Sequence, residues 1–242
     1  MSYKTPLYKS NSVSINNNIF IKREDMLPFS FGGNKLRIAN EYLIDMERTK
    51  SNCLIGYGSL RSNLCRVLAN KWCSKKYACY IVSAIDYEDN IKSTINSSLL
   101  DVCGAHLVVC DKQNVQITVK KTLDLCKEKG FTPYYIYGNE FGTGNREVPV
   151  RAYVECYKEL KMQENEMGIQ FDYVFLANGT GMTRSGLIAG KLLFNGDEEI
   201  IGISIARDSS IEKEIVKNYI EAYMKSISGN DKISNNIEKI YL

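Results

Sequence analysis

Residues 51–83 read SNCLIGYGSLRSNLCRVLANKWCSKKYACYIVS, and this stretch decides the fold class. An apolar run at 53–57 predicts a buried strand, apolar residues at helical spacing over 63–73 predict a helix, and 77–83 predicts a second strand. A strand, a helix and a second strand in this order pair as a right-handed parallel unit, with the helix packed on the sheet. We therefore predict an α/β fold built on a parallel sheet.

The same alternation of strands and helices continues along the rest of the chain. The predicted helices lie at 35–44, 93–102, 113–129, 148–162, 184–194 and 211–226, and the predicted strands at 19–21, 106–110, 134–137, 172–177, 199–206 and 237–242. A glycine-rich turn at 138–144 separates two blocks of this pattern. The prediction is therefore a two-domain protein with open, twisted α/β sheets. Residues 1–45 and 139–242 form a larger, discontinuous domain, and 46–138 form a smaller α/β domain.

Composition and charge exclude several classes of protein. The chain has 242 residues, with 31 Lys and Arg against 28 Asp and Glu, so its formal net charge is +3. So small an excess, without a basic block, argues against a nucleic-acid or membrane-surface binder. The longest apolar runs fall short of the ~20 residues that a membrane span needs, and the first residues lack the apolar segment of a secretory signal. We therefore expect a cytoplasmic protein without nucleic-acid or membrane partners.

The histidine and cysteine counts narrow the possible chemistry. Because His106 is the single histidine, a zinc site with more than one imidazole ligand is excluded, and a Ser-His-Asp triad is improbable. The eight cysteines include no C-x-x-C pair, and most fall in apolar helix or strand patterns, so we interpret them as core thiols. No metal site is predicted.

The segment Gly32-Gly33-Asn34-Lys35-Leu36-Arg37 is the first candidate for chemistry. Two glycines allow a sharp turn and a close approach of the backbone to a ligand. The lysine that follows stands at a helix start, near further cations, and these surroundings favour a lowered pKa and a nucleophilic amine. Spacing alone favours the simpler interpretation, which is a solvated lysine at a helix N-terminus.

The segment 172–190, DYVFLANGTGMTRSGLIAG, is the second candidate. A buried strand runs into a Gly/Thr turn and then a helix, and the N–H groups of such a turn bind anions. The glycines do not match G-x-G-x-x-G, and no Lys-Ser/Thr pair follows, so neither a Rossmann nor a P-loop motif is present. A plain strand–turn–helix connection is the alternative, and a nucleotide-binding α/β protein is a weaker one.

The third candidate is the loop Gly58-Ser59-Leu60-Arg61-Ser62-Asn63, between a predicted strand and helix. Ser62 and Asn63 are common N-cap residues, and capping alone explains them. Together with a reactive lysine and an anion-binding turn, however, a polar loop at a strand end is what a phosphorylated carbonyl cofactor requires. That cofactor is pyridoxal 5'-phosphate (PLP).

Three motifs together resemble a known family. Thr5-Pro6-Leu7, Ile21-Lys22-Arg23-Glu24-Asp25 and the segment 32–37 resemble the start of D-cysteine desulfhydrase and 1-aminocyclopropane-1-carboxylate deaminase. These are tryptophan-synthase-β-like, fold-type II PLP enzymes. The resemblance covers nearly the whole chain, because the loop at 62–66 is similar to the family's substrate loop and 179–187 to its phosphate loop.

The resemblance implies a role for each motif. Lys35 forms the imine with PLP and shuttles the α-proton, and Asn63 hydrogen-bonds the cofactor's phenolic oxygen. Ser62 contacts the substrate carboxylate or assists proton transfer, and Asn63 also faces the substrate. The phosphate is held by Gly179, Thr180, Gly181 and Thr183. The larger domain then binds PLP, and the implied activity is that of a lyase or deaminase. This activity releases ammonia and a 2-oxo acid from a small amino acid, in a homodimer.

The sequence departs from the family's pattern at three places. Leu64 stands where the family's loop usually has His, and Arg61 replaces a usual Gln, so the substrate is expected to differ. Family members also continue well beyond the equivalent of Leu242, so the fold is expected to be C-terminally shortened. The alternative function is therefore a catalytically impaired or non-catalytic relative, or one piece of a split enzyme, that keeps the fold with or without PLP.

Overall fold

A computed structural model of the chain describes residues 4–10, 18–85, 94–205 and 208–228. The chain divides into two compact units by the contacts within it. The first unit comprises Met1–Ile38 and Arg146–Leu242, and the second comprises Ala39–Asn145. The first boundary falls inside helix α1 (Lys35–Arg48), so the helix that begins at Lys35 continues into the second unit.

The second unit is built on a four-stranded parallel sheet with the order β5-β4-β3-β6. Its elements are β3 (Cys53–Tyr57), α2 (Asn63–Ser74), β4 (Ala78–Ile85), α3 (Ile95–Val102), β5 (His106–Asp111), η2 (Lys112–Asn114), α4 (Val115–Glu128) and β6 (Pro133–Tyr135). The predicted α/β class with parallel strands is confirmed. Strand β3 lies inside the sheet, which explains why its run of apolar residues is continuous rather than alternating.

The core of the second unit lies between this sheet and its helices. Trp72 on α2 is fully buried, as its apolar neighbours predict, and its indole Nε1 donates to the sulfur of Met46 at 2.9 Å. His106 is exposed at the start of the edge strand β5, and its ring stacks on Tyr80. Both side chains thus make packing contacts within their own unit.

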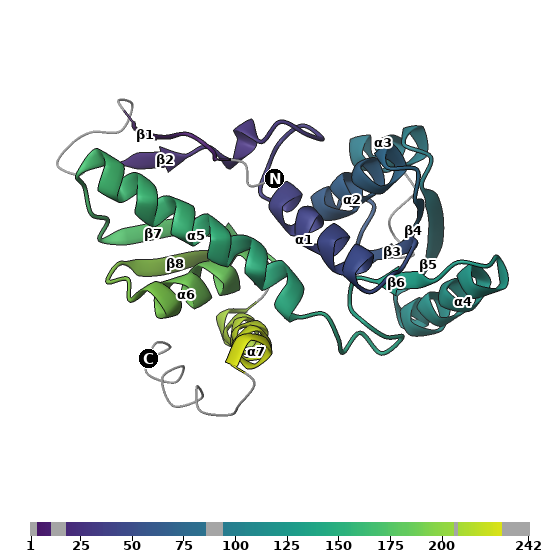
Figure 1. The fold of residues 1–242 in the computed structure, drawn as a ribbon. Coiled ribbons are helices and arrows are strands. Elements are labelled where there is room, and N and C mark those ends of the chain that lie inside the picture. The colour runs from purple at the N-terminus through teal and green to yellow at the C-terminus, as the bar shows by residue number, and fades with distance from the viewer. Residues whose placement is uncertain (1–3, 11–17, 86–93, 206–207, 229–242) are drawn as a thin grey trace. The chain divides into compact units, whose positions relative to one another are not determined.

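The first unit contains a smaller parallel sheet and a helical layer (Figure 1). Its elements are β1 (Leu7–Lys9), β2 (Phe20–Lys22), η1 (Glu24–Met26), α5 (Glu147–Met167), β7 (Tyr173–Asn178), α6 (Met182–Phe194), β8 (Glu199–Ser204) and α7 (Ser209–Ser228). Strands β7 and β8 pair in parallel, and β1 and β2 pair antiparallel. Helix α6 packs against α5, α7 and both parallel strands.

One strand was not predicted, and several predicted elements have other bounds in the structure. Strand β1 was not predicted, because it forms by pairing with β2, more than ten residues further along the chain. Helix α5 runs five residues past the predicted end at 162, to Met167, where Gly168 in the left-handed region ends it. The strand predicted over 134–137 ends at Tyr135, because the N–H of Gly138 turns back to the Tyr135 carbonyl at 2.8 Å. The strand predicted at 237–242 lies outside the described residues.

Helices α5 and α6 approach each other closely because Gly186 has no side chain. A Cβ atom at Gly186 would lie 2.2 Å from the Tyr153 Cβ and 2.6 Å from the Val150 carbonyl oxygen. We therefore expect Gly186→Ala to lower the free energy of unfolding by about 1–3 kcal/mol, the usual cost of overpacking. Denaturant unfolding checks this, with Leu193→Ala on an exposed position of α6 as the control. Equal losses in the two variants would contradict the packing argument.

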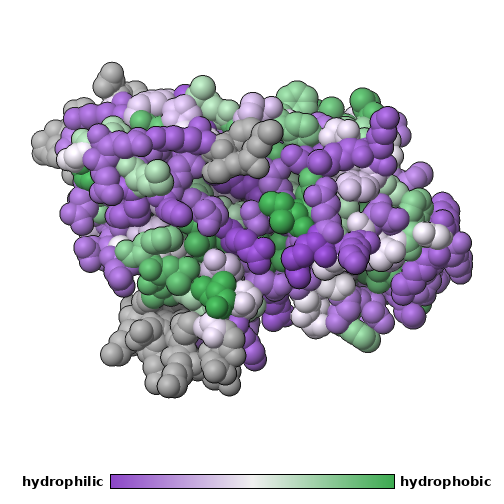
Figure 2. All heavy atoms as spheres, in the orientation of Figure 1, coloured by the Kyte–Doolittle hydropathy of each residue, from purple (hydrophilic) through white to green (hydrophobic). Residues whose placement is uncertain are grey.

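The surface carries apolar side chains among many polar ones. Figure 2 shows a face on which hydrophilic residues predominate and hydrophobic patches lie between them. Exposed apolar residues include Phe175 on β7 and Ile203 on β8, which are 65% and 55% exposed. Among the described helices, none combines the length and the apolar character needed to cross a bilayer.

Candidate active site

The turn that precedes Lys35 has an unusual backbone. Ser30, Phe31, Gly32 and Gly33 all have positive φ values, of 51°, 62°, 72° and 95°. The N–H of Gly33 donates to the Glu24 carbonyl at 3.0 Å, so the turn folds back onto η1. Lys35 is then the first residue of α1. The paired glycines therefore form a tight turn directly before a helix that begins at Lys35, as predicted from the segment 32–37.

Burial lowers the pKa of the Lys35 amine. The sequence pattern predicted a lowered pKa from neighbouring cations and the helix dipole, and that cause was wrong. Each of those cations is paired with a carboxylate in the structure: Lys22 with Glu159, Arg23 with Asp25, and Arg37 with Glu24. Desolvation, which disfavours the charged ammonium, is therefore the physical cause.

The Gly/Thr turn joins β7 to α6. It comprises Gly179, Thr180 and Gly181, and Gly181 is buried with φ 83°. A Cβ atom there would lie 3.2 Å from the Ile215 Cγ2 on α7, and the left-handed backbone disfavours any other residue. The first N–H groups of α6 have no intrahelical partners, and its first turn contains no acidic residue. The turn therefore offers N–H donors at the positive end of a helix dipole.

A hydrogen bond connects the lysine segment to this turn. The side-chain Nδ2 of Asn34 donates to the Thr183 Oγ1 at 3.0 Å. Asn34 immediately precedes Lys35, and Thr183 is the second residue of α6. Because the Thr183 hydroxyl accepts here, its own proton stays available for another acceptor. Lys35 and the Gly179–Thr183 segment thus belong to one unit, and they meet through neighbouring residues.

Two buried donors beside the turn make it suitable for an anion. Among the described residues, nothing accepts a hydrogen bond from the Asn178 Nδ2 or from the Arg184 Nε, and both atoms are buried. Asn178 ends β7 directly before the turn, and Arg184 lies in the first turn of α6. The Arg184 guanidinium also pairs through Nη1 with Glu212 at 3.3 Å. Amide and guanidinium donors, helix N–H groups and an amine whose pKa is lowered by burial suit a molecule with one phosphate and one aldehyde. The residues therefore fit the predicted cofactor.

The polar loop predicted to contact substrate lies in the second unit, at the carboxyl end of β3. Ser62 caps α2, because its Oγ accepts from the Cys65 N–H at 3.2 Å. The Asn63 Oδ1 accepts from the Asn96 Nδ2 at 3.1 Å, which orients the amide so that its own NH₂ group can donate elsewhere. Capping, the simpler interpretation of Ser62, is therefore present. These two hydrogen bonds leave the hydroxyl proton of Ser62 and the NH₂ group of Asn63 able to bind a ligand.

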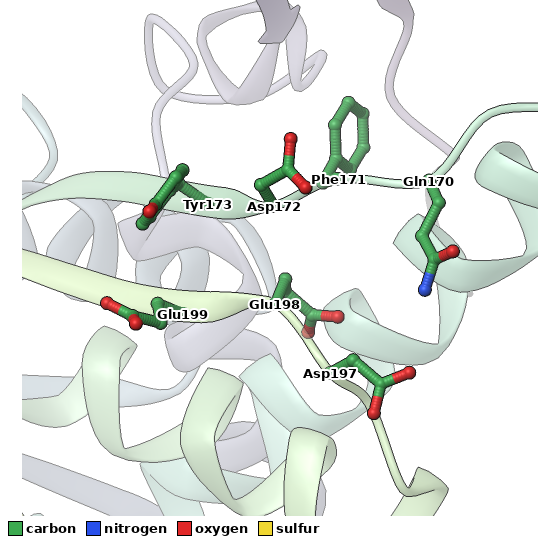
Figure 3. A pocket seen from close by; sticks show the side chains of 7 residues that line it. All are labelled: Gln170, Phe171, Asp172, Tyr173, Asp197, Glu198 and Glu199. Carbon is green, nitrogen blue, oxygen red and sulfur yellow. The ribbon is translucent and has the colours of Figure 1, made fainter.

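A cavity of about 350 Å³ lies elsewhere in the first unit (Figure 3). It is lined at the amino ends of β7 and β8, whereas the Gly/Thr turn follows the carboxyl end of β7. Its lining contains four carboxylates: those of Asp172, Asp197, Glu198 and Glu199. Carboxylates repel a phosphate, so this cavity is not the site that the sequence predicts.

The structure also gives contacts to residues whose roles the sequence did not indicate. Asn34 and Glu24 lie within the motifs above, yet nothing in their spacing predicted that they contact Thr183 and Arg37. Tyr153 on α5 contacts both Glu24 and the Asn34 carbonyl. No local signal marked Tyr153, because it is separated from those residues by more than a hundred positions.

The chain is similar to several known proteins. The family model described as "Pyridoxal-phosphate dependent enzyme" matches residues 2–239. A D-cysteine desulfhydrase of Serratia proteamaculans is 26% identical over 211 residues, and one of Yersinia pestis is 26% identical over 238 residues. A 1-aminocyclopropane-1-carboxylate deaminase of Rhizobium rhizogenes is 28% identical over 192 residues. These matches cover 84%, 95% and 76% of this chain, and 62%, 70% and 56% of the respective relatives.

Solved structures share the fold. The crystal structure of an ACC deaminase homologue superposes with a TM-score of 0.80 at 22% identity, covering 95% of this chain and 69% of that one. An O-ureido-L-serine synthase gives a TM-score of 0.64 at 15% identity, covering 86% of this chain and 62% of the other. At these identities the likeness shows the fold alone. The chain thus spans 56–70% of the length of these five proteins.

Proposed function

The chain belongs to the family of pyridoxal-phosphate dependent enzymes, and we propose that it is a PLP-dependent lyase or deaminase acting on a small amino acid. The observation that carries this proposal is the 3.0 Å hydrogen bond from Asn34 to Thr183. It joins the segment that bears a desolvated lysine to a turn suited to a phosphate. A lone lysine or a lone Gly/Thr turn would not require this cofactor, whereas the two together in one unit match it.

We assign the cofactor's binding groups as follows. The Lys35 amine would hold the aldehyde group, and its lowered pKa leaves a larger fraction of the amine unprotonated at neutral pH than an ordinary lysine has. The phosphate binds the N–H groups of Gly179, Thr180 and Gly181 and the hydroxyl of Thr183. When bound, PLP supplies an electron-withdrawing ring that stabilises negative charge at the α-carbon of the substrate.

The chain's own residues also provide proton transfer and substrate contacts in this proposal. With PLP bound, the Lys35 amine would be the base that takes the α-proton of a substrate that has one. The Ser62 hydroxyl and the Asn63 amide bind polar substrate or cofactor oxygens, since the hydrogen bonds described above leave a donor on each. Arg61 and Leu64 flank these two residues and are the positions at which we expect substrate choice to differ from that of the relatives.

The proposed substrate class follows from the relatives named above. D-Cysteine desulfhydrases and a 1-aminocyclopropane-1-carboxylate deaminase are similar to this chain at 26–28% identity. Loss of a β-substituent begins with removal of the α-proton, whereas 1-aminocyclopropane-1-carboxylate has no α-proton and its ring opens by breaking a bond between the α- and β-carbons. Both reactions place negative charge on the substrate's α-carbon, and both end in ammonia and a 2-oxo acid. We therefore propose one of these two reactions, on an amino acid with a small side chain.

The first experiment measures cofactor capture as a function of pH. The purified protein is mixed with PLP, the visible absorbance is followed, and borohydride-reduced protein is mapped by mass spectrometry. We expect one covalent adduct, on Lys35. Because protonation blocks the amine, the rate of capture rises with pH, and it levels off at a lower pH than for an ordinary lysine, since the pKa of Lys35 is lowered. A rate that still rises through the ordinary lysine pKa would contradict this desolvated state.

Turnover separates the proposed enzyme from a non-catalytic relative. Ammonia and 2-oxo acid are measured with D-cysteine, 1-aminocyclopropane-1-carboxylate and other small amino acids as substrates. Product release from any of them supports the lyase or deaminase assignment. Capture of PLP on Lys35 without any product would instead support the alternative, in which the fold and the cofactor are kept and turnover is lost.

A further inference from the structure

A single carboxylate, that of Glu24, gathers donors from three parts of the first unit. Arg37 donates through Nε to Oε2 at 2.8 Å and through a terminal nitrogen to Oε1 at 2.9 Å. The Thr5 hydroxyl donates to Oε1 at 2.9 Å, and the Tyr153 hydroxyl donates to Oε2 at 3.0 Å. The Glu24 backbone carbonyl also accepts from Gly33. Glu24 therefore holds the turn before Lys35 through its main chain and its side chain.

The Tyr153 hydroxyl contacts a second acceptor, which is the carbonyl oxygen of Asn34 at 3.2 Å. Burial and the charge of Glu24 raise the pKa of Tyr153 well above its ordinary value, so the hydroxyl keeps its proton. One O–H group is thus shared between the Glu24 carboxylate and the carbonyl of the peptide bond that leads into Lys35. A hydrogen bond shared with an ionised acceptor resists displacement more than a neutral one does.

The peptide before Lys35 is therefore held from two helices. Its carbonyl oxygen contacts Tyr153 on α5, and the side chain of Asn34 donates to Thr183 on α6. The spacing of those two helices is itself fixed by the close contact of Gly186 with Tyr153. The start of α1 cannot shift relative to the Gly/Thr turn without breaking one of these contacts.

We infer that Tyr153, together with Glu24, is a positioning residue that fixes where the Lys35 amine stands relative to the phosphate-binding turn. This inference rests on the proposed function, in which Lys35 bonds the aldehyde of PLP while its phosphate is bound at the turn. Tyr153 contacts neither group. It acts by holding the Asn34 carbonyl, and a displacement of about 1 Å between reacting atoms is enough to slow a reaction about 100-fold.

The test compares Tyr153→Phe with Tyr157→Phe in the full chain. Both remove one hydroxyl from a buried tyrosine of α5, but the Tyr157 hydroxyl faces Glu198, at the other end of the unit's parallel strands from the Gly/Thr turn. We expect Tyr153→Phe to slow PLP capture by Lys35 about 10–100-fold, measured by absorbance and borohydride trapping. Tyr157→Phe is expected to capture PLP at the wild-type rate. Thermal unfolding is measured on both variants, and Tyr153→Phe is expected to have the lower midpoint, because its hydroxyl makes two hydrogen bonds. Slow capture by Tyr153→Phe that is fully folded at the assay temperature separates positioning from loss of folding.

A second variant keeps the inference testable if Tyr153→Phe does not fold. Glu24→Gln preserves the size of the side chain and one carbonyl oxygen, but removes the charge that orders its donors, and we expect it to slow capture in the same direction. Equal capture rates in wild type, Tyr153→Phe and Glu24→Gln would overturn the positioning role and leave the proposed function intact. Wild-type protein that forms no adduct on Lys35 would overturn the proposed function, and this inference with it.

Discussion

Lys35→Ala is expected to abolish the covalent adduct with PLP and the visible absorbance that accompanies it. Alanine at this position supplies no nucleophilic amine, and it begins a helix without distorting α1. Since the same amine is proposed to move the α-proton, turnover is expected to fall by at least about 10²–10⁴-fold, the contribution of a positioned general base. The measurements are the absorbance spectrum with PLP, mass mapping after borohydride, and ammonia release.

Lys71→Ala is the matched control for this variant. Lys71 lies on α2 in the second unit, and burial lowers its pKa as it does that of Lys35. A lowered amine pKa alone therefore does not distinguish the two lysines, whereas the neighbouring Gly/Thr turn does. We expect Lys71→Ala to bind PLP and turn over as the wild type does. If the adduct persisted in Lys35→Ala and disappeared in Lys71→Ala, the lysine that binds PLP would be Lys71, in the second unit.

Gly32→Ala is expected to be the most damaging change in the turn that carries Lys35. Its φ of 72° disfavours any residue with a side chain, and a Cβ atom there would lie 1.9 Å from the Asp25 carbonyl oxygen. The left-handed backbone and the collision together predict a loss of about 2–5 kcal/mol in the free energy of unfolding. Because the turn would have to open from η1, we also expect PLP capture by Lys35 to be lost.

Gly33→Ala separates backbone strain from collision. Its φ of 95° is equally unfavourable for alanine, but apart from its chain neighbours no atom lies within 4 Å of the place that the methyl carbon would occupy. We therefore expect a smaller loss of about 1–2 kcal/mol, with PLP capture retained. Denaturant unfolding and borohydride trapping measure both variants side by side. If Gly33→Ala proved as harmful as Gly32→Ala, the close approach of Gly32 to η1 would not be what shapes the turn.

The predictable part of the fold and site is the part that is local in sequence. The apolar run at 53–57 predicted β3, and the helical spacing that follows it predicted α2. A parallel strand that is buried on both faces has several consecutive apolar residues, so it can be recognised from a short stretch of sequence. The glycines at 32–33 and 179–181 likewise indicated turns, and Gly32, Gly33 and Gly181 have the positive φ values that favour glycine. Strand β1 was missed because its pairing with β2 crosses a dozen residues.

The amino-acid sequence by itself determined the α/β class, the turns and the lysine that follows one of them. Only the tertiary structure decided what surrounds that lysine. The cations next to it in sequence are paired with carboxylates, so burial and not repulsion lowers its pKa. The contacts of Asn34 with Tyr153 and Thr183 join positions more than a hundred residues apart. Such contacts depend on how the helices pack. Side-chain periodicity within a short stretch of sequence does not predict which distant residue a helix will contact.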